Sequence, residues 1–350
     1  MVSVLFVVII ILAIGITRFY FDVSKDTGSS SAPAEIIRKL DIDSSGNRIF
    51  EGNNSLYGVV DSGDKVIVAP EWTELSFAGD GLCIGAKRIG GRMLTGCVDY
   101  EGNIAVPFIY RNISRYESDG FVFYIAESDS DGSCVMYNEK FTPYFMRSWD
   151  SCSVTEDGLI LANGDSVYTY SYGENGLLCT KADIAGQALG IDFRFNISSR
   201  LILSRLDCPE LEKITENAAL YLEYAFTGDP SFLAALNTNA AAGSFTRLFP
   251  DDMKIISRKL TGISDIFIYT ERLENGSYSY AVSIMADTEI GYIDENGENC
   301  TLEDSYKAIV RFGSSEGGIT AVSGAFARTE PEYPVREEPT EPYFPENDAF

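Results

Sequence analysis

LYGVVDSGDKVIVAP, residues 56–70, and LTGCVDYEGNIAVP, residues 94–107, are two versions of one sequence pattern. In both, a glycine precedes a short apolar strand, a turn containing aspartate and glycine follows, and a second branched apolar run ends at a proline. The anchor positions return after 37 to 39 residues, a period that is typical of stacked supersecondary units. The two stretches therefore predict a protein built from repeated β-hairpins.

Six residues anchor the predicted turns, namely Gly58, Asp61, Gly63, Gly96, Asp99 and Gly102. Each copy continues after its proline with an aromatic residue, Trp72 or Tyr110, and then a glycine-led apolar strand. A third, degenerate copy of the pattern covers residues 133–144. Because one isolated hairpin is marginal in water, we expect the copies to bury apolar faces on one another in an all-β repeat domain, propeller- or solenoid-like, over residues 41–200.

The pattern G-x-[VI]-D-x-x-G, followed by a branched strand, a proline and an aromatic residue, resembles the WG repeat family of bacteria. The consensus of that family runs roughly Trp-Gly-[Tyr/Phe]-Ile-Asp, and Tyr57 and Thr95 stand here in place of the tryptophan. The chain is thus similar to a divergent member. The resemblance implies a β-rich interaction scaffold with no reaction of its own. The alternative is an ordinary antiparallel β-domain that repeats a hairpin motif.

The first 17 residues contain no charged side chain and are rich in Val, Ile, Leu and Phe. A membrane-spanning helix needs about 20 apolar residues, with about 17 as the lower limit, so residues 1–21 are expected to form a transmembrane anchor. A cleaved signal peptide is the alternative, although the basic n-region is missing. We expect a single-pass membrane protein with its bulk on the extracytoplasmic side, whereas Arg18 and Lys25 favour the opposite orientation.

Two further segments have the composition of unfolded chain. Residues 22–40 include a Gly/Ser stretch and are expected to be a flexible linker. Residues 329–350 combine proline with glutamate and carry no basic residue after Arg336. This composition predicts a disordered acidic tail.

The net charge of −25 and the pI of about 4.3 argue against nucleic acid as a partner, because phosphate binding depends on clustered Lys and Arg. The sequence has no histidine, which removes the commonest general base and the commonest metal ligand. The seven cysteines show no C-x-x-C spacing. We therefore predict no catalytic residues, no metal site and no cofactor.

From Cys208 onward the apolar positions recur at helical spacing, and a Gly-Asp-Pro sequence at 228–230 should end this helix. A second short helix over 231–236, an amphipathic segment around 251–260 and four strands should follow, so residues 205–328 form an α+β domain. The pattern Tyr221-x4-Phe226-Thr227-Gly228-Asp229-x3-Leu233 and the strands after it resemble the NTF2-like cone fold. The resemblance implies a curved sheet around a pocket, for which the candidate residues are Tyr221, Tyr224, Asp265 and Tyr280.

The stretch IGYIDENG, residues 290–297, lies inside this second domain and is closer to the repeat consensus than either clean copy. It is either a repeat hairpin inserted between two strands or ordinary hairpin chemistry that any antiparallel sheet can use.

Binding is the function that these features favour. The first hypothesis is a membrane-anchored scaffold that binds another protein or a cell-wall component, with Trp72, Tyr110 and Tyr116 as candidate contacts. The second is a small-molecule binder or a histidine-free enzyme that uses the pocket of residues 205–328. The third is a subunit of a membrane transport or conjugation apparatus.

Overall fold

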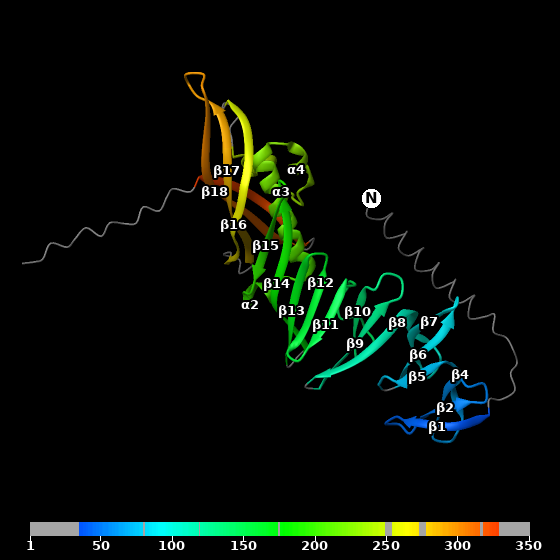
Figure 1. Ribbon diagram of the computed structural model, residues 1–350. Helices are drawn as coiled ribbons and strands as arrows, with labels where there is room; N and C mark the ends of the chain where they lie inside the picture. Colours follow the sequence, from blue (N-terminus) through cyan, green and yellow to red (C-terminus); the bar gives the residue numbers. More distant parts are fainter. Residues whose placement is uncertain are drawn as a thin grey trace, which may run out of the picture. The chain divides into compact units, whose positions relative to one another are not determined.

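The computed structural model describes residues 35–79, 81–118, 120–173, 176–248, 254–272, 278–315 and 318–328. The chain divides into two units, and each is described by itself (Figure 1). The first unit is Met1–Glu117 with Val122–Met146, and the second is Ser118–Phe121 with Arg147–Phe350. Strands β11 to β15, which the sequence placed in the repeat domain 41–200, thus fall in the second unit.

The first unit consists of two antiparallel sheets. Sheet A has the order β1-β2-β3-β4, with strands Ile36–Ile42, Arg48–Gly52, Tyr57–Val60 and Val66–Trp72. Sheet B has the order β10-β9-β8-β7-β6-β5, with strands Glu74–Phe77, Leu82–Ile89, Arg92–Asp99, Ile104–Ser118, Phe121–Ser128 and Cys134–Asn138 for β5 to β10. One apolar core gathers residues of both sheets, including Val59 and Val68 of sheet A and Cys83, Val98 and Phe108 of sheet B. Consecutive strands are joined by hairpins within each sheet, whereas only Thr73 separates β4 of sheet A from β5 of sheet B.

One turn geometry recurs between paired strands. The first side-chain oxygen of an Asp or Asn accepts hydrogen bonds from the backbone N–H groups two and four residues later, over 2.7–3.0 Å. Its backbone carbonyl accepts a bond from the N–H three residues later. The residues that begin these turns are Asp43, Asp61, Asp99, Asn138 and Asp294. The side chain thus fixes the turn locally, as Asx motifs do.

Hydrogen bonding also sets the acidity of these carboxyls. Burial alone would raise the pKa of Asp99, but bonds from Asn103, Glu101 and Gly102 hold that pKa below its ordinary value. The ionised form is therefore the one that the turn stabilises.

The fourth residue of each turn has a positive φ, and its identity differs between the two clean sequence copies. It is Gly102 in the turn of Asp99, with φ +84°, but Asp64 in the turn of Asp61, with φ +64°. Gly63 instead occupies the position of Glu101, whose N–H bonds to the aspartate side chain. The pairing of Gly63 with Gly102 in the sequence pattern is therefore shifted by one residue in the structure.

This shift has a testable consequence. Gly102→Ala should reduce the free energy of unfolding of the first unit by about 1 kcal/mol, because alanine is strained at positive φ. Gly63→Ala should cost less than half as much, since Gly63 is not in the left-handed region. The measurement is urea unfolding followed by Trp72 fluorescence in a Trp149→Phe background, because the chain has only two tryptophans. Equal losses in the two variants would contradict the assignment.

Gly58 and Gly96 are needed for a different reason, which is close approach of the next strand. A Cβ on Gly58 would lie 2.5 Å from the carbonyl oxygen of Val68, and one on Gly96 would lie 2.7 Å from that of Val106. Both neighbouring strands are irregular in register at this point. The two copies therefore share a bulged hairpin in which only glycine fits.

The second unit contains two further antiparallel sheets joined by a helical segment. Sheet C has strands β11 to β15 in sequential order, namely Ser151–Thr155, Gly158–Asn163, Ser166–Gly173, Gly176–Ala188 and Ile191–Ile197. Helices α2 (Arg200–Leu203), α3 (Cys208–Thr227) and α4 (Pro230–Ala235) follow, with a 3-10 turn over Ala242–Ser244. Sheet D has four long strands, β16 to β19, namely Ile255–Arg272, Tyr278–Ile293, Asn299–Ser315 and Gly318–Arg328.

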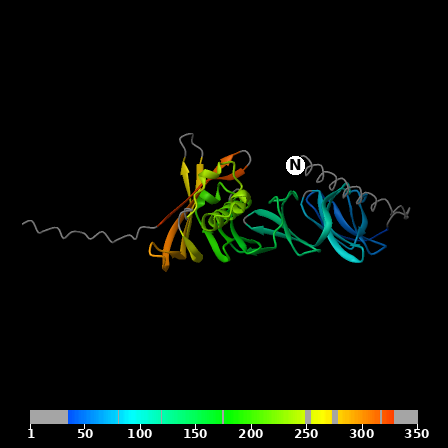
Figure 2. The same cartoon turned by 90° about the horizontal axis from the view of Figure 1, so that it is seen from above.

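Helix α3 begins and ends where its sequence predicts. Asp207 accepts a bond from the N–H of Glu210 while the Glu210 side chain accepts one from the N–H of Asp207, a complete capping box. Gly228 ends the helix with φ +73°. Figures 1 and 2 show α3 beside sheet D, and its residues contact β14, β18 and β19. Tyr221 is fully buried there, with its ring against Gly324.

The structure corrects the predicted fold class of the second domain. Strands predominate in both units, and of the three helices expected before the four strands only α3 and α4 are present. The third expected helix, around 251–260, is instead the start of β16 from Ile255 onward. The 290–297 hairpin is not inserted between separate strands, because β17 and β18 run continuously up to its turn. Only one long helix, α3, is found in the described part of the chain.

The predicted membrane anchor also needs correction. In the described ranges, no helix has both the length and the apolar character needed to cross a bilayer. Residues 1–21, on which the anchor was predicted, lie outside the described residues, as do residues 329–350 of the predicted tail. The predicted single-pass membrane localisation is thus without support. Part of the predicted linker 22–40 is strand, since β1 begins at Ile36.

Candidate functional site

The side chains of the three predicted partner contacts pack against other aromatic rings of the first unit. Trp72 is 6% exposed and stacks on Phe108, with ring centroids 5.1 Å apart. Tyr110 is 5% exposed, and its hydroxyl lies 2.8 Å from that of Tyr137. Tyr116 is half-buried and stacks on Phe123. Each ring therefore contributes to packing within the first unit, and Trp72 and Tyr110 offer little surface to a partner.

The four predicted pocket residues do not form one site. Burial raises the pKa of Tyr221 to about 12, and its hydroxyl donates to the carbonyl of Thr246. Tyr280 is buried, Tyr224 is half-buried, and Asp265 is exposed on β16. No hydrogen bond between described residues joins any two of the four. These four residues therefore do not bring an acid and a base together for proton transfer.

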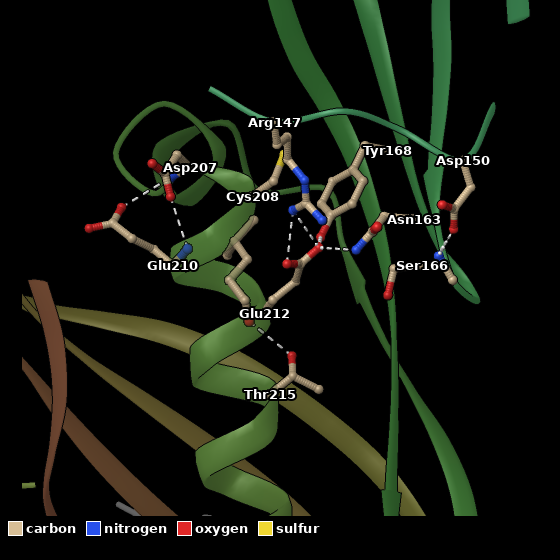
Figure 3. A network of polar contacts seen from close by, with 12 residues as sticks. Arg147, Asp150, Asn163, Ser166, Tyr168, Asp207, Cys208, Glu210, Glu212 and Thr215 are labelled. Carbon is tan, nitrogen blue, oxygen red and sulfur yellow. Dashed lines mark hydrogen bonds and ion pairs between the residues drawn. The ribbon is translucent and has the colours of Figure 1, made fainter. Parts of the chain in front are cut away.

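Glu212, which is not among the predicted site residues, is the centre of a polar network in the second unit (Figure 3). Both oxygens of its carboxylate accept hydrogen bonds from Nη1 of Arg147, over 3.0 and 2.9 Å. Its Oε1 also accepts bonds from the Tyr168 hydroxyl at 2.7 Å and from the Asn163 amide at 3.4 Å. Helix α3 is thereby bound to β12, β13 and the segment that precedes β11.

Aromatic rings enclose this network. The guanidinium carbon of Arg147 lies 4.9 Å from the centroid of Trp149, which packs edge-on against Tyr168 at 5.5 Å. Burial, and then the bond to Glu212, raise the pKa of the Tyr168 hydroxyl well above its ordinary value. The tyrosine therefore stays protonated and donates to the carboxylate. Because both carboxylate oxygens are occupied by protein donors, we interpret the network as a clamp that positions α3.

A single sequence signal points to this clamp. Glu212 lies four residues after Cys208 and three before Thr215, both of which are buried, so a charge stands beside the buried face of the helix. Its donors come from three other segments and are separated from it by at least 44 residues. The sequence alone could not show that they meet.

The face of sheet D that points away from α3 is named here the outer face. Gly324, Val310, Val282 and Ile268 form one cross-strand row against the helix, because Gly324 contacts Tyr221. Side chains alternate along strands, so the neighbouring rows lie on the opposite face. Three rows of the outer face are Tyr269, Ala281, Arg311 and Ser323; Phe267, Ser283, Ile309 and Ala325; and Ser264, Met285 and Lys307.

This outer face carries apolar side chains on β16, β17 and β18 and two cations on β18. The Phe267 side chain is 60% exposed, beside half-buried Ile309 and Met285. Lys307 and Arg311 form no ion pair with any residue that the structure describes. These three rows contain no carboxylate, whereas Asp287, Glu289 and Glu303 lie in the next rows of the same face. In a chain with a net charge of −25, these two cations mark the outer face as distinct.

A second exposed apolar element is β1 of the first unit. It has β2 on one side and no neighbouring strand on the other among the described residues. Ile37 is 62% exposed, and Ile42 is 57% exposed. Arg38 and Lys39 form ion pairs with Glu51 and Asp64, so both cations of β1 are paired.

Within the ranges that the structure describes, no group of three or more Cys, Asp or Glu side chains is arranged to hold a metal ion. No protein-family model matches the chain, and no curated protein matches it. Among solved structures, the chain is similar to dihydro-heme d1 dehydrogenase NirN in complex with DHE, at 11% sequence identity and a TM-score of 0.22. The match covers 85% of this chain and 49% of that protein, so the chain spans about half of its length. A likeness this low carries no argument about fold or function.

Proposed function

We propose that the chain is a non-catalytic binding scaffold whose outer face of sheet D binds another polypeptide. The observation that carries the proposal is the exposure of Phe267 on an open sheet face beside two cations without ion-pair partners. Exposed apolar clusters with a polar surround are typical of interaction sites. An open face also suits a large partner better than a small molecule, which needs a concave site.

The chemistry of the outer face specifies the partner. Phe267, Ile309 and Met285 offer apolar contact, whereas Lys307 and Arg311 offer donors to carboxylates. We therefore propose a partner segment that places apolar side chains on β16 and β17 and carboxylates against β18. This proposal is of the same class as the binding scaffold predicted from the sequence, and it does not use the alternative of an enzyme. The cell-wall and transport-apparatus alternatives stay predictions, since no contact in the structure favours either.

Binding should depend on Phe267. With the full chain as bait, a partner is identified by affinity capture, purified and titrated by calorimetry. Phe267→Asp should weaken its binding at least tenfold, because the variant replaces the most exposed apolar side chain of the face with a charge. Ile37→Asp is the matched control, since Ile37 is equally exposed but lies on β1 of the other unit, and it should change the affinity less than twofold.

Arg311→Glu tests the charge part of the proposal and should also weaken binding about tenfold. A partner that binds Phe267→Asp and Arg311→Glu as tightly as the unchanged chain would refute the outer face as the site.

A further inference from the structure

One row of the outer face of sheet D carries an excess of negative charge. Glu289 of β17 and Glu303 of β18 are direct cross-strand partners, and like charges in this position repel each other. Lys259 of β16 stands opposite Glu289 in the same row. Among the described residues, none of these three side chains forms an ion pair. The row therefore offers two carboxylates and one cation to a partner.

The charges on β18 follow a regular spacing. Glu303, Lys307 and Arg311 are each four residues apart, so all three side chains lie on the outer face. Lys307 is the midpoint, roughly 13 Å along the strand from each of the other two. Asp287 of β17 pairs with Ser305 in the row between Glu303 and Lys307. Carboxylates thus lie on one side of Lys307 and a guanidinium lies on the other.

A second copy of the outer face presents the same charges in reverse order. Suppose that two copies stack face to face about a two-fold axis that crosses β18 at Lys307. Arg311 of each copy then lies opposite Glu303 of the other, because both are four residues from the axis. The two Lys307 side chains meet near the axis, and each is long enough to extend toward Asp287 of the other copy. Every unpaired cation of β18 gains a carboxylate in this arrangement.

The same axis covers the apolar part of the outer face. It exchanges the row of Phe267, Ser283 and Ile309 with the row of Gly262, Asp287 and Ser305, because the row of Lys307 lies between them. The Phe267 side chain, which is 60% exposed, therefore stands over a row that has a glycine at the corresponding position on β16. Stacked sheets lie about 10 Å apart, a separation that their interdigitating side chains fill.

We propose that the outer face of sheet D binds a second copy of this chain and forms a two-fold symmetric dimer. Two-fold pairs are the commonest closed assembly of identical chains. With a net charge of −25, two copies repel each other over most of their surfaces, so association is confined to a face whose charges balance. The charged residues of this face are Lys259, Lys307 and Arg311 with Asp287, Glu289 and Glu303. This inference rests on the proposed function and names its partner.

The size of the face sets the expected affinity. The strands of a sheet lie about 4.8 Å apart, and β18 rises roughly 27 Å from Glu303 to Arg311. A four-stranded patch of this length is at the low end of the areas that specific interfaces bury. We therefore expect a dimer with a Kd in the micromolar range.

The test measures self-association of the full chain by sedimentation velocity at concentrations from about 1 to 300 µM. Arg311→Glu and Glu303→Arg should each weaken association at least tenfold, because each change sets like charges opposite one another in both symmetric pairs. An equimolar mixture of the two variants should associate as tightly as the unchanged chain, since each pair then joins a carboxylate to a guanidinium. Recovery in the mixture also shows that both variants are folded.

Lys213→Glu is the matched control, because it changes the net charge as Arg311→Glu does and Lys213 is exposed on α3. It should change the affinity less than twofold. A chain that stays monomeric throughout the range, or a mixture that associates no more tightly than either variant alone, would overturn the inference. The proposed function is decided separately. A different polypeptide that loses affinity for Phe267→Asp would retain the outer face as a binding site even if the chain is monomeric.

Discussion

Replacing Glu212 by alanine should lower the free energy of unfolding of the second unit by about 2–4 kcal/mol. The carboxylate accepts bonds from Arg147, Tyr168 and Asn163, and its removal leaves a partly buried guanidinium and a buried hydroxyl without this acceptor. Loss of one partner from such a network costs more than the net value of the bonds, because the remaining groups stay desolvated. The side chains of Arg147 and Glu212 are 22% and 28% exposed, so the effect falls short of a fully buried pair.

The measurement is urea unfolding followed by Trp149 fluorescence, since Trp149 lies against Arg147 and Tyr168. Glu216→Ala is the matched control, because Glu216 is exposed on the same helix and has no hydrogen bond in the described structure. It should change the stability by less than 0.5 kcal/mol, in the range usual for surface sites. Similar losses in Glu212→Ala and Glu216→Ala would show that the network does not hold the helix.

Gly324→Ala should destabilise the second unit by about 2–3 kcal/mol. A Cβ at this position would lie 2.3 Å from Cε2 of Tyr221, and the ring is fully buried between α3 and β19. The ring must therefore move, which disturbs its packing against Phe245 and its bond to the Thr246 carbonyl. Overpacking of this kind usually costs 1–3 kcal/mol, and the lost bond adds to it.

Gly313→Ala is the control for Gly324→Ala. It lies in the same sheet, but its Cβ would meet only a methyl group of exposed Val322 at 3.2 Å, which can shift. The midpoint of thermal unfolding should be several degrees lower for Gly324→Ala than for Gly313→Ala. The double variant Gly324→Ala with Tyr221→Leu should lose less than the sum of the single changes, because the smaller side chain makes room. Additive losses would contradict a direct clash.

Some features of the chain follow from a few neighbouring residues, and these were predictable. The turns at Asp61 and Asp99 and the capping box of Asp207 with Glu210 are made by hydrogen bonds that span two to four residues. The one-residue mismatch of Gly63 with Gly102 shows the limit of this reasoning. The sequence pattern aligns Gly63 with Gly102 because both are glycines. In the structure Asp64, not Gly63, shares the positive φ of Gly102 and is therefore the equivalent position.

Exposure could not be predicted in the same way. Trp72 is the last residue of β4 and Tyr110 lies within β8, but they pair with Tyr57 and Thr95 at corresponding positions and are buried. Phe267 lies in an apolar strand that looks equally suited to a core. The pairing of Phe267 with Ser283 and of Ser283 with Ile309 places it on the outer face. A shift of one residue in that register would have turned it toward α3.

By itself the sequence determined the Asx turns, the beginning and end of α3, and the absence of histidine chemistry, because each depends on residue type and on bonds within one turn. The tertiary structure alone decided which donors meet Glu212, which thiol meets Tyr170, and which face of sheet D is open. Those arrangements join residues that are far apart in the chain. Their free energy depends on strand register and helix packing, which no local pattern encodes.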